Sequence, residues 1–177
     1  NFRIGQGVTG ICQSLHNEKL EWLSDCYEAL RQFDKEWSKK QGWPESIKLT
    51  TVKPSGTLSL LAGATPGVHP AYSQCYIRRV RMSSQDALVE TCKTTGYHVE
   101  FVKNFDGTLN RDTVIVEFPC EAGKNAKLAK EMSAVDQLEL VKKIQQKWSD
   151  NAVSCTVYYR KEELGEIKEW LRENYKN

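Results

Sequence analysis

Between residues 47 and 63 a β-branched run passes straight into a turn and then into a leucine-rich segment, "IKLTTVKPSGTLSLLAG". Residues 47–52 are typical of a strand, because β-branched side chains pack well on a pleated surface. Pro54 and Gly56 interrupt regular structure, and the leucines that follow can start a helix. The junction therefore predicts a mixed α/β chain, in which a turn joins the end of a strand to the start of a helix.

The segment before this junction predicts a long helix over residues 17–40. Apolar side chains recur there at helical spacing, and Asn17 can cap the first turn. The stripe consists of Leu20, Leu23, Tyr27, Leu30 and Trp37. Gly42 and Pro44 then end the helix, because neither residue continues one readily.

Further elements are predicted along the second half of the chain. Strands are expected at residues 75–82, 97–102, 113–118 and 152–159, and the second and third are joined by a hairpin-type connection that contains Asp106-Gly107. Capping-box patterns at residues 83–86 and 133–136 predict two helix starts, the first of these helices ending near Gly96. The second of these helices should turn Leu138, Val141, Ile144 and Trp148 inward, and a last amphipathic helix carries Leu164, Ile167, Trp170 and Leu171.

Composition limits the partners and the compartment. The 177 residues carry a net charge of +2, which gives no indication of a nucleic-acid or membrane partner, and no apolar run approaches the roughly 20 residues that cross a bilayer. The six cysteines are irregularly spaced and form no CxxC pair, so reduced thiols in a cytoplasmic protein are expected. The three histidines do not cluster, so no protein-built metal site is expected.

The turn at residues 53–57 has the residue types of a phosphate cradle. The start of a helix leaves backbone N–H groups without intrahelical acceptors, and Gly56 lets the backbone approach a ligand closely. The hydroxyls of Ser55 and Thr57 can donate hydrogen bonds, and Lys53 adds a full positive charge. The Walker pattern GxxxxGK[ST] is missing, and an ordinary turn with a Ser or Thr cap explains the same residues. Local sequence leaves both interpretations open.

Other motifs receive structural interpretations. Arg78, Arg79 and Arg81 could contact phosphates, but ion pairs or a solvated edge strand are favoured, and His69 is expected to brace its loop by hydrogen bonds. Cys26 is interpreted as a core residue of the first helix. Gly5, Gly7 and Gly10 match GxGxxG without a preceding strand, so close backbone packing is the favoured explanation.

The motifs taken together resemble a known family. "RIGQGVTG", "TTVKPSGTLSLLAGATPGVHPAYS", "YIRRVRM", "VIVEFP" and "WSDNAVSCTVYY" follow one another in the order found in adenosylcobalamin-dependent ribonucleoside-triphosphate reductases, the monomeric class II ribonucleotide reductases. The resemblance runs from Arg3 to about Trp170. The block that begins with the Lys53 turn and ends at Ser73 is its most specific part.

The resemblance implies a fold and a site. The family's catalytic domain is a ten-stranded α/β barrel with a finger loop through its centre, and residues 1–177 are expected to be a fragment of this one domain, with covering helices, that follows the finger loop. The loop that matches Lys53, Ser55, Gly56 and Thr57 meets the substrate's phosphates in the family. The whole enzyme is then expected to be cytoplasmic and monomeric.

The resemblance also implies a chemistry for the whole enzyme. Adenosylcobalamin starts thiyl-radical reduction of a ribonucleoside triphosphate to the 2′-deoxyribonucleoside triphosphate, and a dithiol such as thioredoxin supplies electrons. The radical cysteine lies in an N-x-C-x-E setting that none of the six cysteines has. Cys26 comes nearest, with Ser24 in place of Asn. The catalytic cysteine is therefore expected upstream, and this segment alone is expected to be inactive.

Two other functions fit the same residues. An α/β phosphate-binding domain of a different enzyme would need acid and base groups near residues 54–59, and no obvious set is present. A non-catalytic binding module would need a self-sufficient fold.

Overall fold

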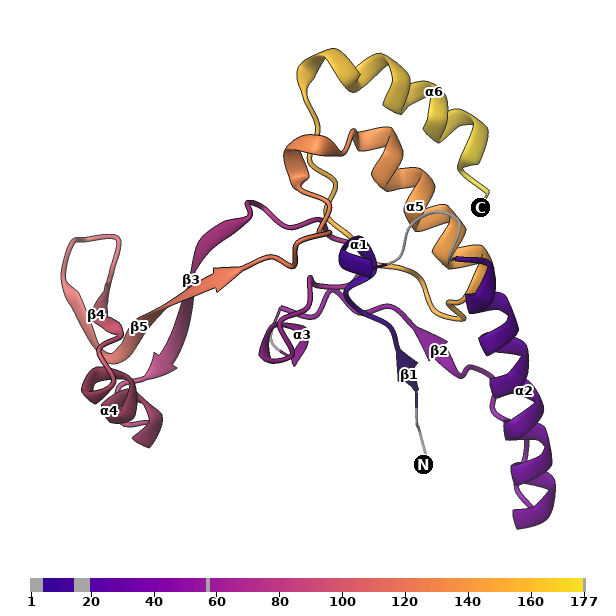
Figure 1. Ribbon diagram of the computed structural model, residues 1–177, viewed down its shortest axis with the longest axis horizontal. Coiled ribbons are helices and arrows are strands. Elements are labelled where there is room, and N and C mark those ends of the chain that lie inside the picture. The colour runs from indigo at the N-terminus through magenta and orange to yellow at the C-terminus, as the bar shows by residue number, and fades with distance from the viewer. Residues whose placement is uncertain (1–4, 15–19, 57, 177) are drawn as a thin grey trace. The chain divides into compact units, whose positions relative to one another are not determined.

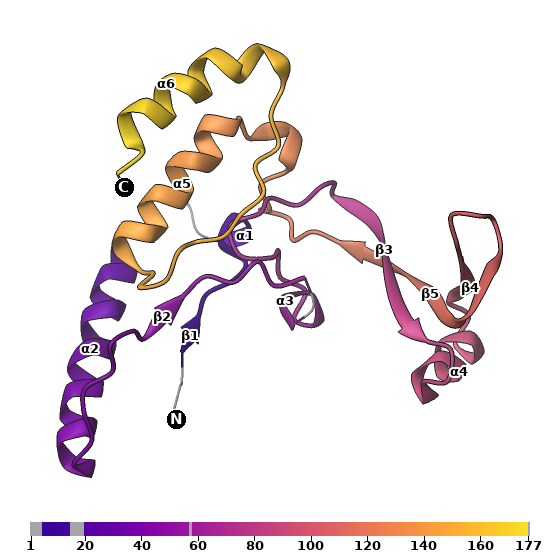
Figure 2. The same cartoon turned by 180° about the vertical axis from the view of Figure 1, so that it is seen from behind.

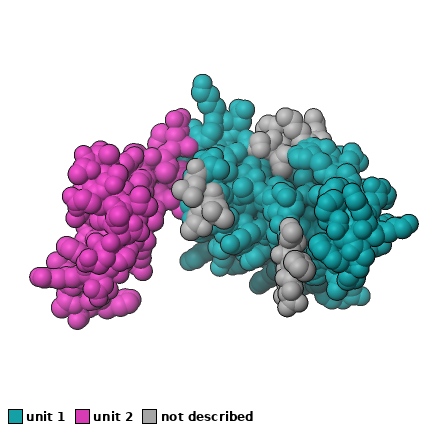
Figure 3. Space-filling model, turned by 90° about the horizontal axis from the view of Figure 1, so that it is seen from below, with its two compact units in different colours: residues 1–74, 122–177 teal, residues 75–121 magenta. Residues whose placement is uncertain are grey.

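The computed structural model describes residues 5–14, 20–56 and 58–176, in two compact units. The first unit comprises residues 1–74 and 122–177, and the second comprises residues 75–121, as Figure 3 shows in two colours. Helices predominate in the first unit, and an antiparallel sheet with one helix forms the second. The mixed α/β class predicted from the sequence is confirmed.

The first unit contains short strands and longer helices (Figure 1). In chain order these are β1 (Gln6–Gly7), α1 (Ile11–Ser14), α2 (Glu21–Gln41), β2 (Thr50–Thr51), α3 (Leu58–Leu61), the 3₁₀ helix η2 (Ala129–Glu131), α5 (Ala134–Lys147), the 3₁₀ helix η3 (Lys161–Glu163) and α6 (Leu164–Asn174). β1 and β2 lie side by side as a parallel pair, with Gln6 opposite Thr50 and Gly7 opposite Thr51 (Figure 2).

Local signals set the ends of the main helices. α2 ends at Gly42, whose φ of 69° is left-handed and whose N–H donates to the carbonyl of Lys39 at 3.3 Å. α5 begins with the predicted capping box: the Asp136 N–H donates to Ser133 Oγ at 3.0 Å, and the Ser133 N–H donates to Asp136 Oδ2 at 3.1 Å. The cap predicted at Asn17 lies outside the described residues.

One apolar cluster joins these elements. It is formed by the buried side chains of Ile11, Cys12, Leu20, Leu23, Val52, Val68, Leu140, Ile144 and Trp148. The cluster combines residues from α1, α2, the exit of β2 and α5, so burial of this common surface holds segments together that are far apart in the chain.

A polar segment, residues 148–151, also fastens β2. Trp148 Nε1 donates to the carbonyl of Thr51 at 3.0 Å, and Asn151 Nδ2 donates to the carbonyl of Thr50 at 3.1 Å. In return, the Thr50 hydroxyl donates to the Trp148 carbonyl. A strand of two residues is thereby held by more than its ladder with β1.

Asp150 is the centre of this attachment. Its Oδ2 accepts hydrogen bonds from the backbone N–H groups of Leu49 at 2.7 Å and Thr50 at 3.2 Å. Its Oδ1 accepts from the Tyr27 hydroxyl at 2.8 Å and pairs with Arg31 Nη2 at 3.1 Å. Burial alone would raise the pKa of the Asp150 carboxyl, but these donors favour the charged form and lower its pKa to about 2.

The second unit is built on a three-stranded antiparallel sheet. Its elements are β3 (Cys75–Ser83), α4 (Ala87–Thr94), β4 (His98–Lys103) and β5 (Leu109–Glu121), with the strand order β3-β5-β4. The connection between β4 and β5 turns at Gly107, whose φ is 83°, as expected for the Asp106-Gly107 turn. Val89 of α4 packs on Val114 and Val116, so α4 covers one face of the sheet.

The opposite face of this sheet is open. Side chains alternate between the faces of a strand, and on β3 the exposed set comprises Cys75, Ile77, Arg79, Arg81 and Ser83. The other residues of β3 lie half-buried toward the face that α4 covers.

The strand predicted at residues 152–159 was wrong. Its side chains do alternate, and Val153 and Cys155 pack on the core. The backbone, however, forms no ladder: the Val153 N–H donates to Gln145 Oε1 at 2.9 Å, and the Thr156 carbonyl accepts from Gln137 Nε2 at 3.1 Å. Side chains of α5 replace the partner strand that the period-two pattern implied.

Two other predicted boundaries also differ. The strand predicted at residues 47–52 is a ladder only at Thr50–Thr51, because the carbonyls of Ser46 and Ile47 accept instead from the Arg31 guanidinium. The capping box predicted at residues 83–86 was wrong as well. Ser83 ends β3, and Asp86 caps α4 by accepting from the Leu88 N–H at 2.9 Å.

None of the helices in the described parts of the chain has the length and apolar character needed to cross a membrane. All six cysteines carry free thiols in the structure.

Replacing Asp150 by Asn should destabilise the protein in a pH-dependent way. The folded-state pKa of about 2 lies below that of an ordinary Asp, about 3.9, so the charged carboxyl contributes about 2–3 kcal/mol at neutral pH. This contribution is lost as the pH falls from about 4 through about 2. Urea unfolding across this range should therefore show a flatter pH dependence for Asp150→Asn than for the parent. Asp25→Asn, on the exposed face of α2, is the control, and equal profiles for both variants would contradict the assignment.

Candidate functional site

The turn at residues 53–56 joins β2 to α3, as the sequence predicted. Ser55 is 8% exposed, and its Oγ accepts a hydrogen bond from the Ser59 N–H at 3.2 Å, while the Ser59 hydroxyl donates to the Ser55 carbonyl. The Ser55 side chain therefore serves the start of α3 as a cap. A hydroxyl that accepts one hydrogen bond keeps its own proton to donate, and no acceptor for it is found among the described residues. Thr57, the fourth predicted residue, lies outside the described residues.

Lys53 and Gly56 form the open side of this turn. The Lys53 side chain is exposed and pairs with no carboxylate in the described ranges. A Cβ built on Gly56 would meet no atom within 4 Å, and Gly56 does not have a positive φ. The chain's own packing therefore does not require glycine at residue 56, and the space over it is open to an incoming group.

A second loop, residues 63–69, supports the turn from behind. Gly67 has a φ of 51°, and a Cβ built on it would lie 2.8 Å from the Lys53 carbonyl oxygen and 3.3 Å from Val52 Cγ1. Real side chains do not occupy such a position without displacing backbone. Gly67 is thus the glycine on which the position of Lys53 depends.

The segment at residues 9–13 holds the second loop. The Thr9 hydroxyl donates to the Thr65 carbonyl and accepts from the Gly67 N–H, both at 2.9 Å. Gln13 adds two bonds: its Oε1 accepts from the Thr65 N–H at 2.7 Å, and its Nε2 donates to the Gly63 carbonyl at 3.0 Å. The loop's backbone polar groups are therefore satisfied by side chains, which makes it ordered without regular structure.

His69 braces the same loop, as predicted. The Thr156 N–H donates to His69 Nε2 at 2.9 Å, so Nε2 acts as an acceptor. Nδ1 lies 2.9 Å from the Pro66 carbonyl oxygen and must therefore carry the proton. Both nitrogens are used in these bonds, as expected of a side chain that braces its loop.

Close packing, predicted for the three glycines at the start of the chain, is found only at Gly10, where a Cβ would lie 3.3 Å from Ala64 Cβ, whereas Gly5 and Gly7 would make ordinary contacts. A Cβ on Gly5 would approach the Leu49 carbonyl oxygen at 3.8 Å, and one on Gly7 would approach Thr51 Cγ2 at 3.9 Å. These glycines lie against the strand that leads into the turn, and Gly10 has a φ of 70° at the entry to α1.

One of the three β3 arginines and two of the cysteines have structural roles. Arg79 pairs with Glu100 and, at 3.1 Å, with Glu117, so the ion-pair interpretation is confirmed for this residue. Cys26 packs half-buried against the main core, as predicted. Burial raises the pKa of the Cys12 thiol to about 12, despite the opposing influence of Lys127, so Cys12 is a core side chain and not a nucleophile.

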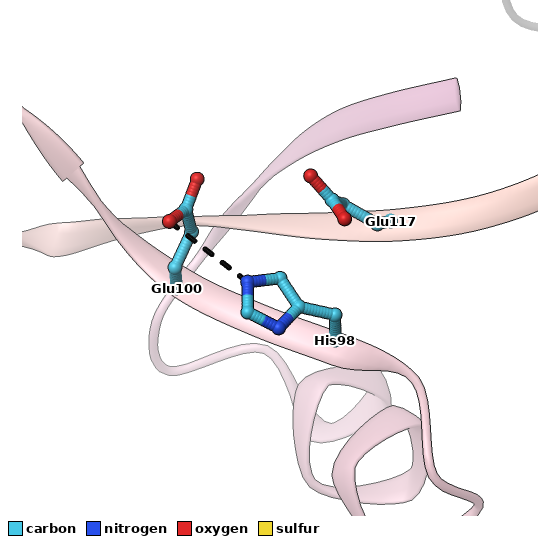
Figure 4. Close-up of side chains that lie close together, drawn as sticks. All are labelled: His98, Glu100 and Glu117. Carbon is cyan, nitrogen blue, oxygen red and sulfur yellow. Dashed lines mark ion pairs between the residues drawn. The ribbon is translucent and has the colours of Figure 1, made fainter. Parts of the chain in front are cut away.

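One cluster of potential metal ligands was missed by sequence analysis. His98, Glu100 and Glu117 lie together on the open face of the second unit's sheet (Figure 4). The spacing of the three histidines along the chain does not reveal this contact, because it depends on the strand register that sets His98 opposite Glu117. The pattern His-Val-Glu on one strand was the signal that could have pointed to it, because residues two apart share a face.

Comparison with known proteins gives one consistent result. Residues 29–177 match the family model described as the barrel domain of ribonucleotide reductase. A probable adenosylcobalamin-dependent ribonucleoside-triphosphate reductase of Dictyostelium discoideum is 40% identical over 163 residues, which are 90% of this chain and 21% of that protein. The corresponding reductase of Euglena gracilis is 42% identical over 169 residues, 93% of this chain and 23% of that protein.

A solved structure agrees. The crystal structure of a B12-dependent (class II) ribonucleotide reductase superposes with a TM-score of 0.72 at 33% identity, covering 96% of this chain and 25% of that one. The chain therefore spans about a quarter of the solved protein and about a fifth of the curated relatives it matches.

Gly67→Ala should destabilise the protein and displace the Lys53 turn. The left-handed backbone alone costs about 1–2 kcal/mol for a residue with a Cβ, and the contact with the Lys53 carbonyl adds to this. Gly56→Ala, with open space and no positive φ, is the matched control and should leave the free energy of unfolding nearly unchanged. Chemical denaturation of both variants measures the difference. Equal stabilities would show that the second loop does not support the turn.

Proposed function

Because the chain belongs to the ribonucleotide reductase barrel-domain family, we propose that it is a segment of an adenosylcobalamin-dependent ribonucleoside-triphosphate reductase. The observation that carries this proposal is the 40–42% identity to two relatives of that name over nine-tenths of the chain. Since the chain covers only about a fifth of their length, the activity is proposed for the complete polypeptide.

The complete polypeptide would convert ribonucleoside triphosphates to 2′-deoxyribonucleoside triphosphates, with electrons from a dithiol such as thioredoxin. Adenosylcobalamin, when bound, supplies the cobalt–carbon bond whose homolysis starts the radical chemistry. We further propose a monomeric, cytoplasmic enzyme. The donors of the Lys53 turn are an ammonium group, a hydroxyl and backbone N–H groups, which suit an anion and not an apolar corrin ring. No described residue is therefore assigned to the cofactor.

The proposed share of this chain is to hold the substrate's phosphates at Lys53, Ser55, Gly56 and Thr57. Lys53 would supply the positive charge, because its exposed ammonium has no carboxylate partner among the described residues. A phosphate oxygen would gain a charge-assisted hydrogen bond there without the loss of an existing ion pair.

Ser55 and Gly56 would supply the neutral hydrogen-bond donors. The Ser55 hydroxyl can still donate its proton while it caps α3. Gly56 presents open space and a backbone N–H for which no acceptor occurs in the described ranges. A phosphate that enters this space would meet donors on a short stretch of backbone, which is the arrangement that anion-binding turns use.

Rigidity supports the same role. β2 is held by β1 and by residues 148–151, and Gly67 lies against the Lys53 carbonyl. A turn that is already ordered loses little conformational freedom when the ligand binds, so more of the interaction free energy remains for binding. It would also place the ribose reproducibly against the reacting groups.

The complete polypeptide should form deoxyribonucleotide only when ribonucleoside triphosphate, adenosylcobalamin and dithiol are all present. The 177-residue chain alone should give no product, because none of its six cysteines has the N-x-C-x-E setting. Product analysis by chromatography tests both statements. Turnover by the chain alone, or by the complete polypeptide without the cofactor, would contradict the proposal.

Lys53→Met in the complete enzyme should raise the KM for the substrate. Loss of a hydrogen bond to a charged group costs about 1.5–3 kcal/mol, which corresponds to a weakening of about 10–100-fold. Gly56→Val should also weaken substrate binding, because its side chain fills the space that the phosphate would occupy, while thermal stability stays unchanged.

Lys48→Met is the matched control, since Lys48 is equally exposed and precedes the strand instead of following it. Adenosylcobalamin binding should remain at the parent level in all three variants. If folded Lys53→Met and Gly56→Val enzymes kept the parent KM, the turn would have only a structural role and the phosphate assignment would be withdrawn.

A further inference from the structure

Three potential metal ligands meet on the open face of the second unit's sheet. His98 of β4 stands directly opposite Glu117 of β5, and Glu100 follows His98 by two residues, so all three side chains point to the same face. α4 covers the other face. The cluster is therefore formed by strand register, as Figure 4 shows, and each of its side chains is at least partly exposed.

The donor atoms are close enough for one ion. His98 Nε2 lies 3.9 Å from Glu100 Oε2, and one donor atom from each of the three residues lies within 4.8 Å of the other two. A tetrahedral ion with bonds of about 2.0–2.2 Å needs donors about 3.3 Å apart. Small rotations of the half-buried glutamate side chains would cover the remaining distance, so the backbone need not move.

Arg79 holds the two carboxylates in position. Its Nε pairs with Glu117 Oε1 at 3.1 Å, and its Nη2 pairs with Glu100 Oε1. The oxygen of Glu100 that faces His98 is the other one, Oε2. Arg79 thus lies where outer-shell groups orient carboxylate ligands. The two carboxylates, Arg79 and a neutral His98 carry a net charge of −1, which still attracts a cation.

We propose that His98, Glu100 and Glu117 bind a divalent first-row transition ion of the Zn²⁺ type, with water completing its coordination. One imidazole nitrogen and two carboxylate oxygens form a mixed donor set that suits Zn²⁺, whereas Mg²⁺ prefers oxygen ligands alone. The ion would link β4 to β5 and would stabilise the sheet, because the site exists only in the folded state. This inference is independent of the proposed reductase activity.

The test is titration of the reduced, metal-free 177-residue chain with ZnCl₂, followed by the NMR signals of the His98 imidazole. This signal is chosen because the six thiols also bind Zn²⁺ and would dominate a calorimetric measurement. The His98 signals should shift saturably with Zn²⁺ and should not respond to MgCl₂. If Zn²⁺ leaves the His98 signals in place while cysteine signals move, binding occurs at thiols and the proposal is overturned.

Variants test whether the two glutamates bind the ion together with His98 or whether His98 binds it alone. Glu117→Gln and Glu100→Gln should each weaken the Zn²⁺ response of His98 by about tenfold or more. Glu121→Gln is the matched control, since it removes the same charge from the same face of β5 outside the cluster. If Glu117→Gln unfolds the sheet, Glu100→Gln provides the same test, because Glu100 is the more exposed of the two, at 40% against 26%. Parent-like affinity in folded Glu100→Gln would overturn the proposal.

Discussion

The hydrogen bonds of Asp150 hold together the parts of the chain on which the candidate site rests. One carboxylate ties the Tyr27 hydroxyl and the Arg31 guanidinium of α2 to the backbone N–H groups of Leu49 and Thr50. Its neighbours Trp148 and Asn151 reach the other polar groups of β2. Without these donors and acceptors, a strand of two residues would have only the short β1 ladder to define it.

The position of the Lys53 turn follows from this attachment. β2 ends directly before Val52, a core residue, so the exit of the strand is set by both polar bonds and apolar burial. Gly67 then lies against the carbonyl of Lys53, and Thr9 and Gln13 order the loop that contains Gly67. An exposed lysine and an open glycine thus stand on a framework held by hydrogen bonds and apolar burial, which is the support that the proposed phosphate contact needs.

Sequence patterns predicted several helix ends and turns that depend on residues close together in the chain. The Ser133 capping box, the glycine that ends α2 and the Asp106-Gly107 turn each depend on neighbouring residues, and each was correct. The failures arose where distant partners intervene, and they include the local capping pattern at residues 83–86, because Ser83 pairs with Thr113 of β5 instead. Residues 152–159 alternate like a strand but bond to Gln145, His69 and Gln137, and the His98–Glu117 contact depends on register alone. At the site, the turn was located correctly, and close approach of a ligand at Gly56 stays a prediction. Gly67, the glycine that packing requires, was not singled out from the sequence, because its contact with Lys53 depends on the fold.

The arginines of β3 have a consequence for self-association. β3 is an edge of the three-stranded sheet, and such an edge offers unpaired backbone groups to the edge of another molecule. Two copies that paired along β3 in antiparallel register would bring the guanidinium groups of Arg79 and Arg81 against those of the second copy. Repulsion between the Arg81 side chains, for which no ion pair occurs among the described residues, opposes this pairing. Arg79 contributes less, because Glu100 of β4 and Glu117 of β5 neutralise it within each copy. Arg79 thus steadies the sheet within one molecule, whereas Arg81 opposes its growth into an intermolecular sheet.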